Sequence, residues 1–153
     1  MYSWGVLHHT GDLRQALNLA AVPVRSQGRL LISIYNDQGG ASRRWTRVKL
    51  AYNRLPRRLR FLVVLPSLAI TWRQAFVHDV IHFHPLRTWR NYGGARGMSA
   101  WHDLIDWVGG YPFEVAKPEE IFEFYQRRGF RLEGLRTCGG GKGCNEFLFL
   151  RER

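Results

Sequence analysis

The hydrophobic positions at the start of the chain follow two different periods. Residues 4–7 form a short apolar run, which predicts a buried strand. From Leu13 onward apolar residues recur at i, i+3, i+4, i+7 and i+8, which predicts an amphipathic helix with Thr10 as its N-cap. A turn at 25–28 leads into a second apolar strand over 30–35. Strands joined through a helix make a right-handed crossover, so we expect these two strands to be parallel.

The middle of the chain has the helical period. Ser42 is expected to cap a helix with one apolar face, which Pro56 ends. Residues 59–83 are apolar enough to predict a mostly buried helix. Residues 86–97 carry several glycine turn signals and are expected to form a loop, after which Ser99 caps a further helix.

The last third of the chain predicts one helix and two strands. Pro118 suits the first turn of a helix over 119–128. Strands are expected over 130–137 and 145–151, and the glycine-rich segment between them is too short for a parallel crossover. The pair is therefore predicted to be an antiparallel hairpin, and the fold class to be α/β.

Composition bounds the class of protein. The chain has 153 residues, 45% of them hydrophobic, which suits a single domain over 1–153 with its own core. The longest apolar stretch, 61–72, is interrupted by Pro66 and is too short to span a bilayer. Two cysteines make no disulfide framework, so we expect reduced thiols and a cytoplasmic location.

Positive charge is concentrated in one segment. The formal net charge is +11, and no acidic residue occurs between 38 and 78. The basic residues of this segment are Arg43, Arg44, Arg47, Lys49, Arg54, Arg57, Arg58, Arg60 and Arg73. Residues 43–60 can therefore contact nucleic acid, an anionic membrane or an acidic partner domain, or they form a solvated helix face.

Short motifs along the whole chain resemble those of a known family. They are Val6-Leu7-His8-His9-Thr10, Tyr35-Asn36-Asp37-Gln38-Gly39, Arg96-Gly97-Met98-Ser99, Trp101-His102-Asp103, Trp107-Val108-Gly109-Gly110-Tyr111-Pro112-Phe113-Glu114 and Gly143-Cys144-Asn145-Glu146-Phe147. The sequence resembles class I S-adenosylmethionine-dependent methyltransferases, in a branch related to quinone O-methyltransferases. The resemblance covers the C-terminal half of that domain only.

This resemblance implies a fold and an activity. The fold would be a partial Rossmann-like sheet containing strands four to seven, with the last strand antiparallel and inserted beside the fifth. Residues 38–117 would be a helical substrate lid within the domain. The activity would be methyl transfer from S-adenosylmethionine to a small-molecule acceptor, with oxygen as the expected acceptor atom. The glycine-rich donor loop would lie in an N-terminal half, which we expect as a missing partner of this chain.

Candidate catalytic and cofactor residues follow the first predicted strand. Open α/β sheets bind ligands at the carboxyl ends of their strands, where His8 or His9 can act as general base. Side chains alternate along a strand, so we expect only one of the two to face the site. The alternative is a histidine that bonds the backbone at a helix entry. The resemblance assigns Trp4 and Gly5 to the methyl donor, with core packing as the alternative for Trp4.

Candidate substrate contacts are spread along the chain: Tyr35, Asn36, His102, Tyr111 and Asn145. Asn36 is also an ordinary turn former, and the aromatic residues also suit a core. No metal is expected, because the histidines lack the spacing of a metal motif. A rival interpretation is a non-catalytic basic module that binds nucleic acid. Another has residues 57–72 lying on a membrane to collect a lipid-like quinone acceptor.

Overall fold

The computed structural model describes residues 1–152, except for the side chains of Ala95 and Arg96; Arg153, the last residue of the predicted domain, lies outside the described residues. The chain divides into two compact units. The α/β unit comprises residues 1–46 and 112–152, and the helical unit comprises Arg47–Tyr111. The described residues form six α-helices and one mixed sheet of four strands, so the α/β class predicted from the sequence is confirmed.

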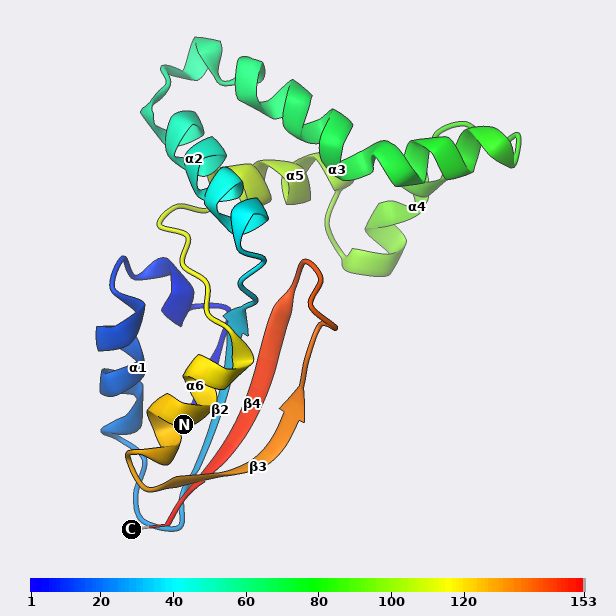
Figure 1. The fold of residues 1–153 in the computed structure, drawn as a ribbon. Coiled ribbons are helices and arrows are strands. Elements are labelled where there is room, and N and C mark those ends of the chain that lie inside the picture. The colour runs from blue at the N-terminus through cyan, green and yellow to red at the C-terminus, as the bar shows by residue number, and fades with distance from the viewer. Residues whose placement is uncertain (153) are drawn as a thin grey trace. The chain divides into compact units, whose positions relative to one another are not determined.

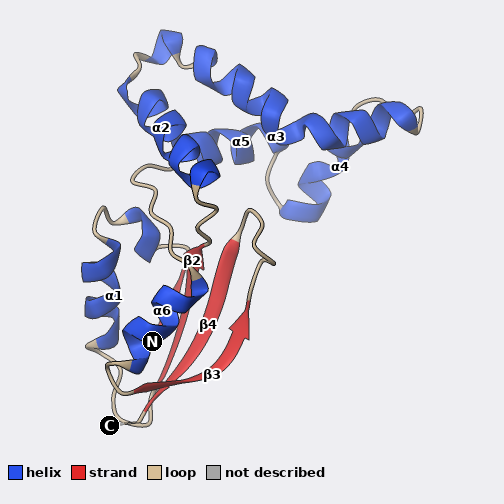
Figure 2. Cartoon of the chain, in the orientation of Figure 1, coloured by secondary structure: helices blue, strands red, loops and turns tan. Residues whose placement is uncertain are grey.

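The sheet has the strand order β1-β2-β4-β3, of which β2, β4 and β3 can be followed in Figure 2. Its strands are β1 (Tyr2–Trp4), β2 (Arg29–Tyr35), β3 (Phe130–Arg136) and β4 (Cys144–Arg151). β1 and β2 are parallel, whereas β4 runs antiparallel to both of its neighbours. The predicted parallel pair and the predicted hairpin are both confirmed, and the last strand lies beside the second.

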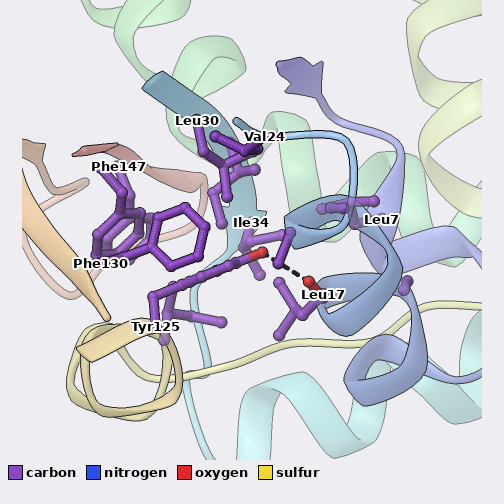
Figure 3. Packing of buried hydrophobic residues seen from close by; sticks show 14 of the residues in the cluster. Leu7, Leu17, Val24, Leu30, Ile34, Tyr125, Phe130 and Phe147 are labelled. Carbon is purple, nitrogen blue, oxygen red and sulfur yellow. Dashed lines mark hydrogen bonds between the residues drawn. The ribbon is translucent and has the colours of Figure 1, made fainter. Parts of the chain in front are cut away.

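Two helices cover one face of this sheet, α1 (Leu13–Ala21) and α6 (Pro118–Gln126) (Figure 1). The predicted apolar face of α1 is confirmed, because Leu17 and its apolar neighbours are buried against the sheet. Tyr125 of α6 is fully buried among core aromatics, and its hydroxyl donates a hydrogen bond of 2.9 Å to the Leu17 carbonyl (Figure 3). This bond ties the two helices together inside the core.

The N-terminal segment differs from its prediction. β1 ends at Trp4, and Leu7–His9 form a single 3-10 turn instead of continuing the strand. Gly5 has φ +70, a left-handed conformation that ends an extended strand. Thr10 is not the N-cap of α1, because its hydroxyl donates to the carbonyl of Leu7. Asp12 is the N-cap instead and accepts from a backbone N–H of the first turn.

The helical unit contains most of α2 (Gly40–Arg54), the 3-10 turn η2 (Arg57–Leu59), α3 (Phe61–Ile81), α4 (Arg87–Arg96) and α5 (Ala100–Gly109). Tyr52, Val64, Leu104 and Val108 form its small core. α2 ends before Pro56 as predicted, and Ser99 caps α5 as predicted. Ser42, however, lies inside α2 and is not its N-cap; its hydroxyl accepts from the backbone N–H of Gln38.

Two further expectations for this unit are wrong. Residues 86–97 were expected to form a loop but contain α4, because Trp89 and Tyr92 pack against Trp72 of α3 with ring centroids 4.7 and 5.1 Å apart. These long-range contacts outweigh the glycine turn signals. The helix α3 was expected to be mostly buried, but most of its side chains are exposed. It also continues through Pro66, so that Arg57–Ile81 is long and apolar enough to cross a membrane by length and composition.

The sequence pattern predicted the wrong environment for one basic residue, Lys49. Lys49 was counted with the solvent-facing arginines of residues 43–60, yet its side chain is buried. Its ammonium group donates to the carbonyl of Trp107 and lies 3.9 Å from the centre of the Trp107 ring. The long aliphatic stem of lysine packs in the apolar core while the ammonium group finds both partners there. Lys49 therefore contributes to the helical core and not to the basic surface.

Candidate functional site

The candidate site lies at the carboxyl ends of β1 and β2, within the α/β unit. His8 and His9 follow β1 in the 3-10 turn, and Tyr35 is the last residue of β2. Because β4 is antiparallel, its first residues lie at this same edge, where Asn145 pairs with Ile34. The sheet therefore brings together five of the residues predicted for the site: His8, His9, Tyr35, Asn36 and Asn145.

His8 is a buried hydrogen-bond acceptor. Its side chain has no exposed surface, and its Nδ1 accepts a hydrogen bond of 3.3 Å from the backbone N–H of Tyr35. The His8 and Tyr35 rings are also in contact, with centroids 4.0 Å apart. A neutral imidazole whose Nδ1 accepts carries its proton on Nε2. His8 thereby fastens the 3-10 turn to the end of β2.

His9 has the opposite tautomer. Its Nδ1 lies 2.6 Å from the carbonyl oxygen of Pro112, and a carbonyl can only accept, so Nδ1 donates. The neutral ring then has its basic lone pair on Nε2. His9 is also only partly buried, whereas His8 is enclosed. The two histidines therefore differ in burial and in hydrogen bonding. Strand alternation, the reason expected for a difference between them, is wrong, because both lie in a 3-10 turn. That only one of them faces the site stays a prediction.

The segment following the helical unit supports both histidines. Phe113 packs on Tyr35 with ring centroids 5.2 Å apart, and the backbone N–H of Glu114 donates to the His8 carbonyl. The Glu114 carboxylate accepts from the backbone N–H groups of Gly11 and Leu13, at 3.0 and 2.9 Å. A carboxylate at a helix N-terminus satisfies otherwise unpaired donors and interacts favourably with the helix dipole. Glu114 thus joins this segment to the start of α1.

Sequence reasoning missed the roles of Pro112, Phe113 and Glu114. All three belong to a motif that carries the family resemblance, but nothing local indicated their partners. The contacts span about a hundred residues along the chain, from the histidine turn to Pro112 and Glu114. The one local signal was that Glu114 is acidic but does not stand at the start of a predicted helix that it could cap.

Asn36 and Asn145 form a network that holds the glycine-rich hairpin loop. The Asn145 amide donates 3.0 Å to the side-chain oxygen of Asn36, whose own amide donates 3.1 Å to the Gly141 carbonyl. The Asn145 side-chain oxygen accepts from the backbone N–H of Cys138 at 3.1 Å. Both asparagines are buried. Their amide groups therefore bond the loop between β3 and β4, directly beside the candidate site.

Trp4 and Gly5 lie at the end of β1. Trp4 is 50% exposed, so it does not pack in the core that the described residues of the α/β unit form. A Cβ added at Gly5 would meet no atom within 4 Å, which shows that the space beside this backbone is open. An exposed indole next to open backbone is a surface that can contact a flat ligand.

His102 and Tyr111 belong to the helical unit. His102 is exposed, and its Nδ1 lies 2.7 Å from the hydroxyl of Ser99, the N-cap of the same helix. Tyr111 is also exposed. The structure therefore assigns these two predicted substrate contacts to a different unit from the histidine turn.

A cleft of about 610 Å³ lies in the helical layer of the α/β unit. It is lined by α1, α6 and residues 114–116 just before α6, and the lining includes Leu17, Glu114 and Phe124. None of the residues at the strand ends that were predicted for catalysis lines it. The cleft is therefore separate from the candidate site.

Cysteine and metal chemistry add little to this site. Cys138 and Cys144 are both free thiols. Burial raises the pKa of the Cys144 thiol, which keeps it protonated and unreactive near neutral pH. Among residues 1–152, no group of three or more histidine, cysteine, aspartate or glutamate side chains is arranged to hold a metal ion.

Comparison with known proteins identifies no relative: no family model matches the chain, and no curated protein or solved structure is significantly similar to it.

Proposed function

We propose that this chain is part of a class I S-adenosylmethionine-dependent methyltransferase that methylates an oxygen of a small acceptor. The observation that carries the proposal is the strand order β1-β2-β4-β3 with β4 antiparallel. In the family that the sequence resembles, the fourth and fifth strands are parallel and the antiparallel last strand inserts beside the fifth. The order and directions here are compatible with strands four, five, seven and six of such a sheet, which supports the proposal.

The histidine turn supports oxygen as the acceptor atom. When bound, S-adenosylmethionine would supply an electrophilic methyl group with its sulfur as the leaving group, so an acceptor hydroxyl would have to lose its proton as its oxygen attacks. His9 has its lone pair on Nε2, because Nδ1 is bonded to the Pro112 carbonyl. It is the candidate general base, and it takes the hydroxyl proton on Nε2. His8 holds the turn in place through Tyr35 and does not need to touch the acceptor.

The end of β1 suits one side of the methyl donor. The open space at Gly5 and the exposed Trp4 indole leave room for an adenosyl group to contact this strand end. We propose that a donor-binding half of the domain pairs with β1, which is an edge strand whose Tyr2 is exposed, as is Val6 shortly after it. The insertion over 38–117 would serve as the substrate lid, with His102 and Tyr111 as its acceptor contacts. The reduced thiols favour the cytoplasm as the location.

A methyl-transfer assay tests this proposal. Residues 1–153 and the longest in-frame product of the same gene are each incubated with radiolabelled S-adenosylmethionine and a panel of phenols and quinols. We expect residues 1–153 to bind the donor weakly by calorimetry, because β1 and its turn supply only part of a donor site. A longer product with a donor loop should label at least one acceptor. Micromolar donor binding by residues 1–153, or no transfer by a product that binds the donor, would contradict the proposal.

The alternative function is a basic module without catalytic activity. The arginines at 43, 44, 47, 54, 57 and 58 are exposed, which favours an anionic partner. If nucleic acid is that partner, affinity for RNA or DNA should fall steeply with salt, because neutralised phosphates release counterions.

A further inference from the structure

Many apolar side chains of α3 are left uncovered by the described residues of the helical unit. Its inner side chains, including Val64 and Trp72, are buried in contacts with α4 and α5. The outer positions should be polar if they met water alone. Beside the exposed Arg73, Gln74 and His78, seven large apolar side chains along α3 are each at least 53% exposed: Phe61, Leu62, Leu65, Ile70, Val77, Val80 and Ile81. These exposed side chains together are called the outer face of α3. An apolar surface of this extent is typical of an interaction site.

A cluster of positive charge adjoins the N-terminal end of this face. Arg57 and Arg58 form the turn before α3, and both are exposed. Arg54 at the end of α2 is also exposed. The first acidic residue after this cluster is Asp79, at the far end of α3, where hydrogen bonds from Thr88 hold its pKa below the usual value. The exposed arginines therefore lie beside an apolar surface with no acid nearby in sequence.

We propose that the outer face of α3 binds the surface of an anionic lipid bilayer, with Arg54, Arg57 and Arg58 on the lipid phosphates. An interfacial helix needs buried apolar area and cations for the headgroups, and this segment supplies both. Nucleic acid would account for the arginines but would leave the apolar face in water. This inference does not depend on methyl transfer, since it concerns a surface of the helical unit alone.

The helix lies on the bilayer and does not span it. Arg73 occurs midway along the exposed side of α3, and a charge at the centre of the hydrocarbon is costly. The opposite side of the helix is occupied by α4 and α5 and contains the buried Asp79. Only the outer side is available to lipid, so the helix is expected to lie in the headgroup region with its axis along the surface.

Vesicle co-sedimentation of residues 1–153 tests the proposal. Wild-type chain should bind vesicles of equimolar phosphatidylglycerol and phosphatidylcholine, bind pure phosphatidylcholine more weakly, and lose affinity as salt is added. The triple variant Leu62→Asp, Ile70→Asp, Val77→Asp should bind at least about tenfold more weakly, because the apolar contacts are lost. The double variant Arg57→Glu, Arg58→Glu should lose about a hundredfold on anionic vesicles only, since each arginine contributes substantially at such a surface.

Matched controls come from the α/β unit. Leu19→Asp with Val22→Asp changes two equally exposed apolar residues of α1 and its end, and Arg14→Glu reverses an exposed arginine of the same helix. Both controls should bind vesicles like wild type. All variants change exposed positions, and circular dichroism melting confirms that each is folded.

Three results would overturn the proposal. The first is no binding of wild type to anionic vesicles, and the second is equal loss of binding in the α1 controls. The third is concentration-dependent self-association that the Leu62, Ile70 and Val77 variant abolishes while vesicles remain unbound, which would make a second copy the occupant of this face. RNA binding that needs Arg57 and Arg58, with no vesicle binding, would favour the nucleic-acid alternative instead.

Discussion

Replacing His8 should mainly lower the stability of the protein, whereas replacing His9 should mainly lower the rate of catalysis. His8→Ala removes a fully buried ring and leaves the backbone N–H of Tyr35 without its acceptor. The cavity and the unpaired donor together should lower the free energy of unfolding by about 3–4 kcal/mol. His9→Ala releases the Pro112 carbonyl from a partly exposed ring, which should cost about 1 kcal/mol because water can replace the bond.

Urea denaturation of residues 1–153 measures this difference. With a typical dependence on urea, the His8→Ala midpoint should fall by about 1.5 M, and the His9→Ala midpoint by about 0.5 M. His8→Asn provides a control for the hydrogen bond, because the asparagine oxygen can accept from Tyr35. It should recover part of the loss. Equal midpoints for the two alanine variants would refute the assignment of His8 as the residue that fastens the turn.

The catalytic half of this prediction uses a methyl-transferring form of the protein. His9→Ala should lower kcat about a hundredfold with a neutral phenol, because the general base is lost. The loss should be much smaller with an acceptor acidic enough to be ionised already, since that oxygen needs no base. A loss of equal size for both acceptors would mean that His9 acts on structure and not on proton transfer.

Three further substitutions, one of them with a matched control, test the framework of the α/β unit. Glu114→Ala should lower the free energy of unfolding of residues 1–153 in urea by about 2 kcal/mol, because the start of α1 loses two charged hydrogen bonds. The control Glu123→Ala removes only an exposed ion pair and should cost less than about 0.5 kcal/mol. Tyr125→Phe should cost about 1 kcal/mol in the same assay. Burial raises the pKa of Tyr125 in the folded protein. The stability that its neutral hydroxyl contributes is therefore complete below the unfolded pKa of about 10 and should be lost as pH rises further. Urea denaturation at increasing pH measures this loss. Asn145→Leu leaves the backbone N–H of Cys138 without an acceptor and so loosens the loop. Maleimide should then label Cys138 at least about tenfold faster than in wild type. An unchanged rate would show that the asparagine does not hold the loop.

Sequence pattern predicted the elements whose neighbours along the chain supply their own signals. The apolar face of α1, the strand β2 and the terminal hairpin were predicted with bounds close to those observed. Pro118 begins α6 as expected. Each of these elements has a clear period or a strong start signal, and its packing agrees with that local preference. The α/β class and the parallel and antiparallel strand pairs followed from these elements and their connection lengths.

Only the tertiary structure decided the features that depend on distant partners. α4 is helical although its glycines favour turns, because aromatic contacts with α3 stabilise it. Lys49 is buried because Trp107, far along the chain, supplies both a carbonyl and a ring. Periodicity also could not show that the outer side of α3 stays uncovered, since an apolar helix gives the same pattern whether or not a neighbour covers it.

The same division holds at the candidate site. The sequence by itself placed His8, His9 and Tyr35 after strands that end at a common sheet edge, which is a consequence of the parallel crossover. It did not distinguish the two histidines, because their tautomers depend on hydrogen bonds to Tyr35 and Pro112, contacts that span 27 and 103 residues. A residue type and its position along a strand thus determine where a side chain can lie, but its protonation and its accessibility are properties of the atoms that the fold brings against it.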